Sequence, residues 1–348
     1  MIHGMHGSAR DIEVTVVIPV LNGERYLAEV LDAVAAQQGA GTVEILVIDS
    51  GSTDASLGLV RARPGVRLHE IPNDEFGHGR TRNLGARLAS GRVVAFLTQD
   101  ATPAGPHWLR ELILPLSIPS VVGVFGRQLP RSHAFPLQKY DIGRAFEMQG
   151  PPDRVSLRSL AGGTPDGLDR LAFYSDVNSA STRAFLTEVL PYRDIAYSED
   201  LAFARDALTA GFSIAYAPAG AVLHSNDATI REYRRRMFDE TVGQRRSGSK
   251  LPPLPLRTAV AHAGAGALRD SIRILRDRDY GPGASLRWLI VNPWYHLARW
   301  RGMSAGSRAA LDDLAALDRA SLEATRRESA ARSTTEPDLP AGPHSTAL

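Results

Sequence analysis

Two aspartates follow apolar runs of the sequence, at points where a buried strand would end and a loop would begin. Asp49 comes directly after the run 43–48, and Asp100 comes three residues after the run 93–97. In an open α/β sheet, loops at the carboxyl ends of parallel strands line the ligand crevice. A carboxylate there supplies the hard oxygen ligand that Mg²⁺ or Mn²⁺ on a diphosphate needs. We therefore expect Asp100 to bind a divalent metal, Mg²⁺ or Mn²⁺; the simpler alternative is an aspartate that caps a turn.

Strand-like and helix-like patterns alternate over the first hundred residues. Apolar, mostly β-branched runs at 14–20, 43–48, 66–71 and 93–97 are typical of buried strands, and apolar residues recur at helical spacing over 24–38, 55–63 and 80–89. This alternation predicts an α/β fold with a parallel sheet covered by helices. The polar residues expected at the carboxyl edge of that sheet are Asn22, Glu24, Asp49, Gln99 and Asp100.

The second half of the chain is less regular. We predict an irregular segment over 163–181, a helix over 200–211, a short strand over 214–217, helices over 229–246 and 258–278, and a proline-rich linker at 251–256. The Ser, Thr and Pro composition after residue 331 predicts a disordered tail.

Composition narrows the class of partner. The chain has 348 residues, of which 43% are hydrophobic and 22% charged, and a formal net charge of +2. These values predict a globular protein and argue against nucleic acid as a partner. The absence of cysteine leaves only oxygen and nitrogen ligands for a metal and suits a reducing cytoplasm. Neither an export signal nor a membrane-spanning segment is expected, so we predict a cytoplasmic protein.

Aromatic and basic residues are interleaved late in the chain: Arg287, Trp288, Trp294, Tyr295, Arg299, Trp300 and Arg301. Such a mixture indicates peripheral contact with a membrane, at its inner face. The alternative is an ordinary solvated helix face over a core.

Four motifs follow one another along the chain: VIPVLN at 17–22, VIDSGSTD at 47–54, GRTRNLGA at 79–86 and YSED at 197–200. In this order they resemble the family 2 inverting glycosyltransferases, over roughly residues 14–225. FLTQDA at 96–101, together with HGRTRN at 78–83, resembles most closely the bacterial rhamnosyltransferases of that family.

The resemblance implies a GT-A fold, with a mostly parallel central sheet, helices on both faces and, in this chain, a C-terminal helical extension. It also implies transfer of a sugar from a nucleotide-diphosphate donor to a hydroxyl of a cell-surface glycan or polyprenyl-linked saccharide. Rhamnose from dTDP-rhamnose is the best expectation, and UDP- or GDP-sugars are the alternatives.

Donor-binding residues are carried over by the same resemblance: Pro19, Leu21, Glu24, Asp49, Arg80, Gln99 and Asn178. Asp49 would accept a hydrogen bond from a pyrimidine imide, although a loop aspartate can also cap the next helix. Arg80, preferred over Arg82, would contact the diphosphate, although both arginines can be solvated. His78 would approach the donor phosphates or lie in a mobile loop.

The resemblance to the family also implies which residues act on the acceptor and which bind the metal. Asp200 would deprotonate the acceptor hydroxyl and Glu199 would orient the acceptor, whereas the helix dipole alone also favours acids in a first turn. His224 would complete the metal site with Asp100, or would be a structural histidine. The family's usual Asp-x-Asp is replaced here by residues 98–100, Thr-Gln-Asp. A single carboxylate predicts weak metal binding without donor.

The expected organisation is a flexible start (1–10), a nucleotide-sugar-binding half (11–125), an acceptor-binding and catalytic half (126–228), a helical extension (229–303) and a helical, then disordered tail (304–348). Two rival classes remain open. A nucleotidyltransferase would need a Gly-rich, Lys-bearing phosphate loop, which does not follow Val20. A catalytically lapsed glycan-binding homologue is favoured by Thr98 and disfavoured by the retained Asp200 and His224.

Overall fold

The computed structural model describes residues 13–160, 167–226 and 228–327. The predictions of a flexible start and a disordered tail beyond residue 327 lie outside these residues. The strands are β1 (Val14–Val20), β2 (Val43–Asp49), β3 (Val66–Glu70), β4 (Val93–Leu97), β5 (Thr102–Pro103), β6 (Val121–Pro130), β7 (Ser156–Ser159), β8 (Asn178–Thr182) and β9 (Ser213–His224).

The α-helices are α1 (Leu27–Ala35), α2 (Ser56–Arg61), α3 (His78–Leu88), α4 (Trp108–Ile113), α5 (Pro136–Glu147), α6 (Leu168–Leu171), α7 (Glu199–Thr209), α8 (Ile230–Arg246), α9 (Leu256–Ile274), α10 (Pro282–Arg308) and α11 (Leu314–Ala320). The first four strands and the helices between them lie where the sequence pattern placed them, with ends that differ by a few residues.

One mixed sheet joins all nine strands, in the order β3-β2-β1-β4-β8-β6-β9-β5, with β7 beside β9. The pairs β3-β2, β2-β1 and β1-β4 are parallel, as predicted from the alternation of strands and helices. β8 then pairs antiparallel with both β4 and β6, while β6 and β9 are parallel. The expected boundary at residue 125 falls inside β6, so the two expected halves share this sheet.

The prediction of an irregular segment over 163–181 is wrong where the structure describes it, because α6 and β8 lie there. β8 has the sequence NSAST, whose polar side chains hide a buried strand from a reading of hydrophobic pattern. Ser181 illustrates how the strand is stabilised: its hydroxyl donates to the carbonyl of Val122 at 2.5 Å. β9 is also longer than predicted and continues to His224.

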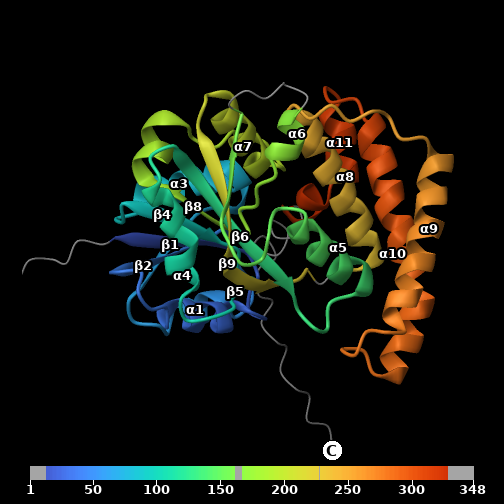
Figure 1. Cartoon of the computed structure of the whole chain (residues 1–348), viewed down its shortest axis with the longest axis horizontal. Coiled ribbons are helices and arrows are strands. Elements are labelled where there is room, and N and C mark those ends of the chain that lie inside the picture. The colour runs from blue at the N-terminus through green and yellow to red at the C-terminus, as the bar shows by residue number, and fades with distance from the viewer. Residues whose placement is uncertain (1–12, 161–166, 227, 328–348) are drawn as a thin grey trace, which may run out of the picture.

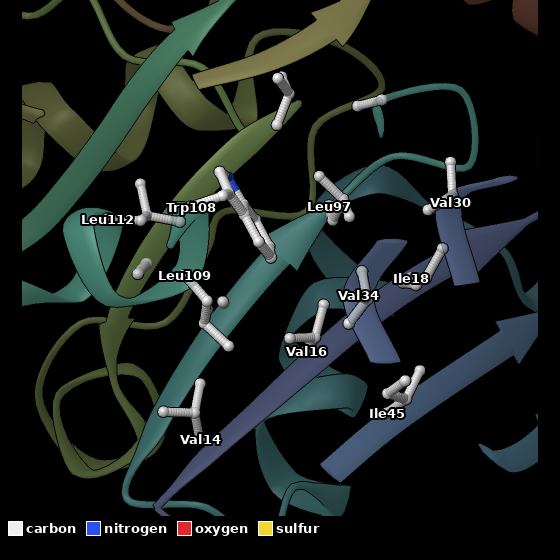
Figure 2. Packing of buried hydrophobic residues seen from close by; sticks show 14 of the residues in the cluster. Val14, Val16, Ile18, Val30, Val34, Ile45, Leu97, Trp108, Leu109 and Leu112 are labelled. Carbon is white, nitrogen blue, oxygen red and sulfur yellow. The ribbon is translucent and has the colours of Figure 1, made fainter. Parts of the chain in front are cut away.

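Two apolar clusters cover the two faces of the sheet. On one face, side chains of β1, β2 and β4 pack against α1 and α4, with Trp108 the largest of them (Figure 2). On the other face, Phe96 and Phe125 pack with Tyr192 and Phe203 near α3 and α7. With both faces covered, the β strands deliver loops of fixed position to the carboxyl edge of the sheet.

The C-terminal helices form a layer beside the sheet (Figure 1). α8 begins with a capping box: Thr229 accepts from the backbone of Glu232, whose carboxylate accepts from the Thr229 backbone. α8 packs against α10, and α10 against α9, so that α9 stands at the outer edge. Close approach of α8 and α10 needs glycine, because a Cβ on Gly302 would lie 2.3 Å from the carbonyl oxygen of Arg234.

Among the described residues, no helix is long and apolar enough to cross a bilayer.

Candidate active site

The loop after β1 is held by side chains from neighbouring loops. Gln99 accepts a hydrogen bond from the backbone N–H of Leu21 at 2.8 Å and donates to the Leu21 carbonyl at 3.1 Å. Asn22 has a positive φ of 50°, and its side chain accepts from the Thr53 backbone at 2.8 Å. The carboxyl ends of β1, β2 and β4 are thereby fixed to one another, and the predicted residues Leu21, Asp49 and Gln99 lie at one edge of the sheet.

Asp49 has one oxygen in use and one without a partner. Its Oδ1 accepts from the backbone N–H groups of Gly51 and Ser52, both at 2.9 Å. Its Oδ2 is buried and has no hydrogen-bond partner within the described residues. A buried acceptor without a partner is costly, so this oxygen is suited to an N–H group of a ligand. Oδ1 therefore closes the turn after β2 and does not cap α2, which begins at Ser56, whereas recognition of a base by Oδ2 stays a prediction.

Asp100 and His224 come together at the other side of this edge. His224 Nε2 lies 3.5 Å from Asp100 Oδ2, and the Asp100 side chain is 25% exposed. Burial would raise the pKa of Asp100, but His224, Thr98 and Arg236 together outweigh burial and lower that pKa to about 2. The other imidazole nitrogen, Nδ1, lies 2.9 Å from the amide oxygen of Gln128. Because that oxygen only accepts, Nδ1 carries a proton and Nε2 is the nitrogen that faces Asp100.

These two side chains can hold a divalent cation only with further ligands. Among the residues that the structure describes, no group of three or more His, Asp or Glu side chains is arranged to bind a metal. The remaining ligands must therefore come from donor oxygens or water. Gln128, which the sequence analysis did not select, fixes the tautomer of His224, and nothing in the hydrophobic pattern of β6 distinguishes it.

Arg236 on α8 is a second residue that the sequence analysis left out of the site. Its positive charge contributes to lowering the pKa of Asp100. Its side chain is 25% exposed, and its Nε donates to Glu240 at 2.8 Å. Six arginines occur over residues 231–246, and nothing in the sequence distinguishes one from another. Only the fold identifies Arg236 as an arginine whose charge acts on Asp100.

A buried network of charges surrounds Asp200 at the start of α7. Arg82 from α3 donates to Glu199 at 2.6 Å and lies 3.2 Å from Asp176. Asp176 also accepts from Tyr192 at 2.9 Å and from Ser179 at 2.5 Å. Arg82, Asp176 and Glu199 are buried. Two acids, Glu199 and Asp176, therefore share one guanidinium in an environment of low polarity, and Asp200 is their neighbour.

Burial raises the pKa of Asp200 well above that of an ordinary aspartate, and the charges of Glu199 and Asp176 raise it further. Arg82 opposes this rise. Ser198, directly before the pair, has a positive φ of 63°, which is a strained conformation for a residue other than glycine. A carboxyl group with a raised pKa at a strained helix start can accept a proton near neutral pH.

The two centres are joined by a short path of hydrogen bonds. From Asp100 it runs through His224 to Gln128, whose amide donates to Ser175 at 2.9 Å. The next residue, Asp176, donates its backbone N–H to Asp200 at 3.4 Å. Asp100 and Asp200 are thus connected through Gln128 and the adjacent residues Ser175 and Asp176.

Arg82 corrects one expectation. We considered it together with Arg80 for the diphosphate, but its guanidinium is occupied by Glu199 and Asp176 in the interior. Arg80 is exposed and lies 3.4 Å from Asp194. The helical spacing of the sequence could have distinguished Arg82 from Arg80, because Arg82 falls on the same face of α3 as the buried small residues Gly79 and Ala86. His78 begins α3 and packs between Phe76 and Tyr197, so it does not lie in a mobile loop.

Three further residues were predicted to bind the nucleotide-sugar donor: Asn178, Glu24 and Pro19. The amide of Asn178 accepts from Trp108 at 2.9 Å and donates to the carbonyl of Gly220 at 2.7 Å, inside the sheet. Glu24 accepts from the Ala55 backbone at 3.0 Å at the start of α2. Pro19 pairs with Ile48 in β1 and is half-buried. Contact of these residues with a donor stays a prediction.

Known proteins resemble this chain in sequence. The glycosyl transferase family 2 domain matches residues 15–176. The O-antigen chain rhamnosyltransferase RfbN of Salmonella typhimurium is 32% identical over 233 residues, which are 66% of this chain and 72% of RfbN. The O-antigen chain rhamnosyltransferase WbaN of Salmonella anatum is 30% identical over 206 residues, which are 57% of this chain and 62% of WbaN.

Solved structures resemble it in fold. The mannosyltransferase PcManGT of Pyrobaculum calidifontis has a TM-score of 0.52 at 18% identity, covering 84% of this chain and 87% of that one. TarS of S. aureus has a TM-score of 0.50 at 16% identity, covering 89% and 79%. At such identities the likeness shows the fold alone.

The fold and the relatives define a nucleotide-sugar transferase with the GT-A architecture, as the motif order predicted. The chain belongs to glycosyltransferase family 2.

Proposed function

We propose that this enzyme moves a sugar from a nucleotide-diphosphate donor to a hydroxyl of a cell-surface glycan or polyprenyl-linked saccharide, with inversion at the anomeric carbon. The observation that carries the proposal is the partly buried carboxyl group of Asp200, whose pKa is raised, joined through Asp176, Ser175 and Gln128 to the pair of His224 and Asp100. A base and a cation site on one short path are the two parts that a single displacement needs.

In this mechanism the acceptor oxygen attacks the anomeric carbon while the bond to the diphosphate breaks. Asp200 takes the acceptor proton, and the nucleotide diphosphate leaves with the electron pair of the broken bond. Glu199, held by Arg82, orients the acceptor. Arg80 and Arg236 bind the departing diphosphate by charge-assisted hydrogen bonds. A divalent ion held by Asp100 and His224 would neutralise part of the negative charge on that diphosphate.

The donor is proposed to be dTDP-rhamnose. The two O-antigen chain rhamnosyltransferases, at 32% and 30% identity, support rhamnose. PcManGT, described with GDP-Man and Mn²⁺, and TarS, described with UDP-GlcNAc, support a nucleotide-sugar donor in general, and PcManGT supports a divalent metal such as Mn²⁺. The free Oδ2 of Asp49 suits a ring N–H of the base, such as the imide N–H of thymine or uracil. An acceptor carried on a polyprenyl lipid would place the enzyme at the inner face of the cell membrane.

A donor screen tests this proposal. Purified protein is incubated with dTDP-rhamnose, UDP-sugars or GDP-sugars and Mn²⁺ or Mg²⁺, and the release of free nucleotide diphosphate is measured. We expect release to be fastest with dTDP-rhamnose. Faster release from a GDP-sugar would contradict the donor assignment, and no release from any donor would favour a catalytically lapsed glycan-binding homologue.

Metal binding is expected to depend on Asp100 and on the donor nucleotide. Asp100→Asn should weaken Mn²⁺ binding in the presence of dTDP by at least about tenfold, because only His224 and donor oxygens would remain. Calorimetric titration with and without dTDP measures this. Asp74→Asn, at an exposed aspartate, is the matched control. Tight Mn²⁺ binding by the wild-type protein without any nucleotide would refute the incomplete site proposed here.

Arg236 is expected to contribute to donor binding. Arg236→Met should weaken binding of dTDP with Mn²⁺ by roughly tenfold to a hundredfold, the usual value of a hydrogen bond to a charged group. Arg231→Met, at an exposed position of the same helix, should leave binding unchanged. Equal affinities of both variants in the same calorimetric titration would remove Arg236 from the site.

A further inference from the structure

The outer side of α9 is unusually apolar. Leu256, Val260, Leu268 and Ile272 are spaced by four or eight residues, which places them on one side of the helix, and each is at least 46% exposed. The buried residues of α9 are mostly small, including Ala259, Ala263 and Ala267. Apart from Ile274, which is buried, the larger apolar side chains of this helix are thus exposed while its small ones face the protein. A helix stabilised only by internal packing would have the reverse arrangement.

α10, the neighbour of α9, also exposes large apolar side chains. Its Leu286, Ile290 and Trp294 are also four residues apart, and they are 63%, 63% and 59% exposed. α9 and α10 pack against each other and are joined by a short turn, so the end of α9 and the start of α10 lie at the same end of the hairpin (Figure 1). We call the exposed residues at that end the hairpin face: Leu268, Ile272, Leu275, Leu286, Ile290 and Trp294.

The aromatic residues selected from the sequence are divided by the structure. Trp288 and Tyr295 pack in a cluster with Phe135, and Trp300 stacks on His262. Trp294 alone of these four is strongly exposed. A membrane-binding surface would therefore be formed mainly by the aliphatic residues of the hairpin face, and only Trp294 of the aromatic residues would belong to it.

Charge around the hairpin face is mostly positive. Residues 256–308 contain nine arginines, no lysine, no glutamate and three aspartates. The three aspartates are engaged within the protein, Asp270 with His296 and Asp277 and Asp279 with Lys139. Arg269, Arg276, Arg278 and Arg287 are exposed beside the apolar side chains. An apolar face with an arginine rim is complementary to an anionic lipid surface.

We propose that the hairpin face docks on a bilayer that contains anionic phospholipid. A second copy of the chain fits this face less well, because a symmetric contact would place the arginines of one copy against those of the other. α10 also packs on α8, which carries Arg236, so docking would hold the transfer site one helix layer from the membrane. The proposal concerns a surface outside that site and does not rest on the proposed sugar transfer.

Vesicle co-sedimentation of the full chain tests the proposal without donor or acceptor. The protein should bind vesicles of phosphatidylcholine with phosphatidylglycerol and bind vesicles of phosphatidylcholine alone much more weakly. Ile272→Gln with Trp294→Gln should reduce binding at least about tenfold, since two large side chains no longer enter the interface. Arg276→Gln with Arg278→Gln should reduce it roughly fivefold per arginine, and added salt should do the same.

Met148→Gln with Val189→Gln is the matched control, because these two apolar residues are 74% and 56% exposed but lie outside the hairpin. Its binding should equal that of the wild type, and thermal unfolding should be unchanged in all three variants. Equal vesicle binding by the Ile272→Gln, Trp294→Gln protein would overturn the proposal. So would a dimer, seen by light scattering, that this variant splits, because a second copy would then occupy the face.

Discussion

Asp200→Asn is expected to lower the rate of sugar transfer by about 10²- to 10⁴-fold, the usual contribution of a general base. The amide has nearly the same shape as the carboxylate but cannot take the acceptor proton. Oδ1 of Asp200 accepts from the backbone of Leu201 at 2.8 Å, a bond that the amide oxygen can keep. Donor binding should therefore be unchanged. Initial rates with saturating donor, together with calorimetric titration of the nucleotide, measure both quantities.

The matched control is Asp206→Asn on the same helix, where the aspartate forms an ion pair with Arg193 near the surface. Its transfer rate should remain near that of the wild type. Transfer at the wild-type rate by Asp200→Asn, with donor binding retained, would show that another group is the base.

The pH dependence of transfer follows from the same residue. A base acts only when it is unprotonated, so the rate should fall as the pH drops through the pKa of Asp200. Because burial and the charges of Glu199 and Asp176 raise that pKa, this fall should begin at a higher pH than the ordinary aspartate value of about 3.9 would give. A rate that stays constant down to pH values near 4 would contradict the role of Asp200.

Parts of this site could be predicted from the sequence because they follow from strand polarity. Asp49 and Asp100 come after continuous apolar runs, and the ends of parallel strands meet at one edge whatever the tertiary detail. Glu199 and Asp200 were found by motif order, and their position at the start of α7 agrees with it.

The remaining parts depend on contacts between distant segments. Gln128 reaches His224 from β6, 96 residues away, and Arg82 reaches Glu199 across 117 residues. No local periodicity carries such information. β8 was missed for a different reason: a strand of serines and an asparagine is stable here because each side has a partner in the sheet, and single-sequence patterns detect only apolar burial.

Arg82→Met is expected to destabilise the protein by about 3–5 kcal/mol, the cost of removing one partner from a buried ion pair. Methionine fills much of the same space, but it leaves the carboxylates of Glu199 and Asp176 in the interior without their cation. Denaturant unfolding at constant ionic strength measures the loss. Arg80→Met, two residues away on the exposed face of α3, should change stability by less than about 0.5 kcal/mol.

The sign of the pH dependence distinguishes this electrostatic cause from a packing defect. In the wild type, burial raises the pKa of Asp176 and Arg82 opposes the rise. Without Arg82 that pKa rises further. A carboxyl group whose folded pKa exceeds its unfolded value reduces stability as the pH rises from the unfolded pKa, about 3.9, to the folded one. The deficit of Arg82→Met should therefore be largest near neutral pH and shrink as the pH falls toward 4. A deficit that is the same at both pH values would assign the loss to packing, and Arg82→Lys, which keeps the charge, should recover part of the stability at neutral pH.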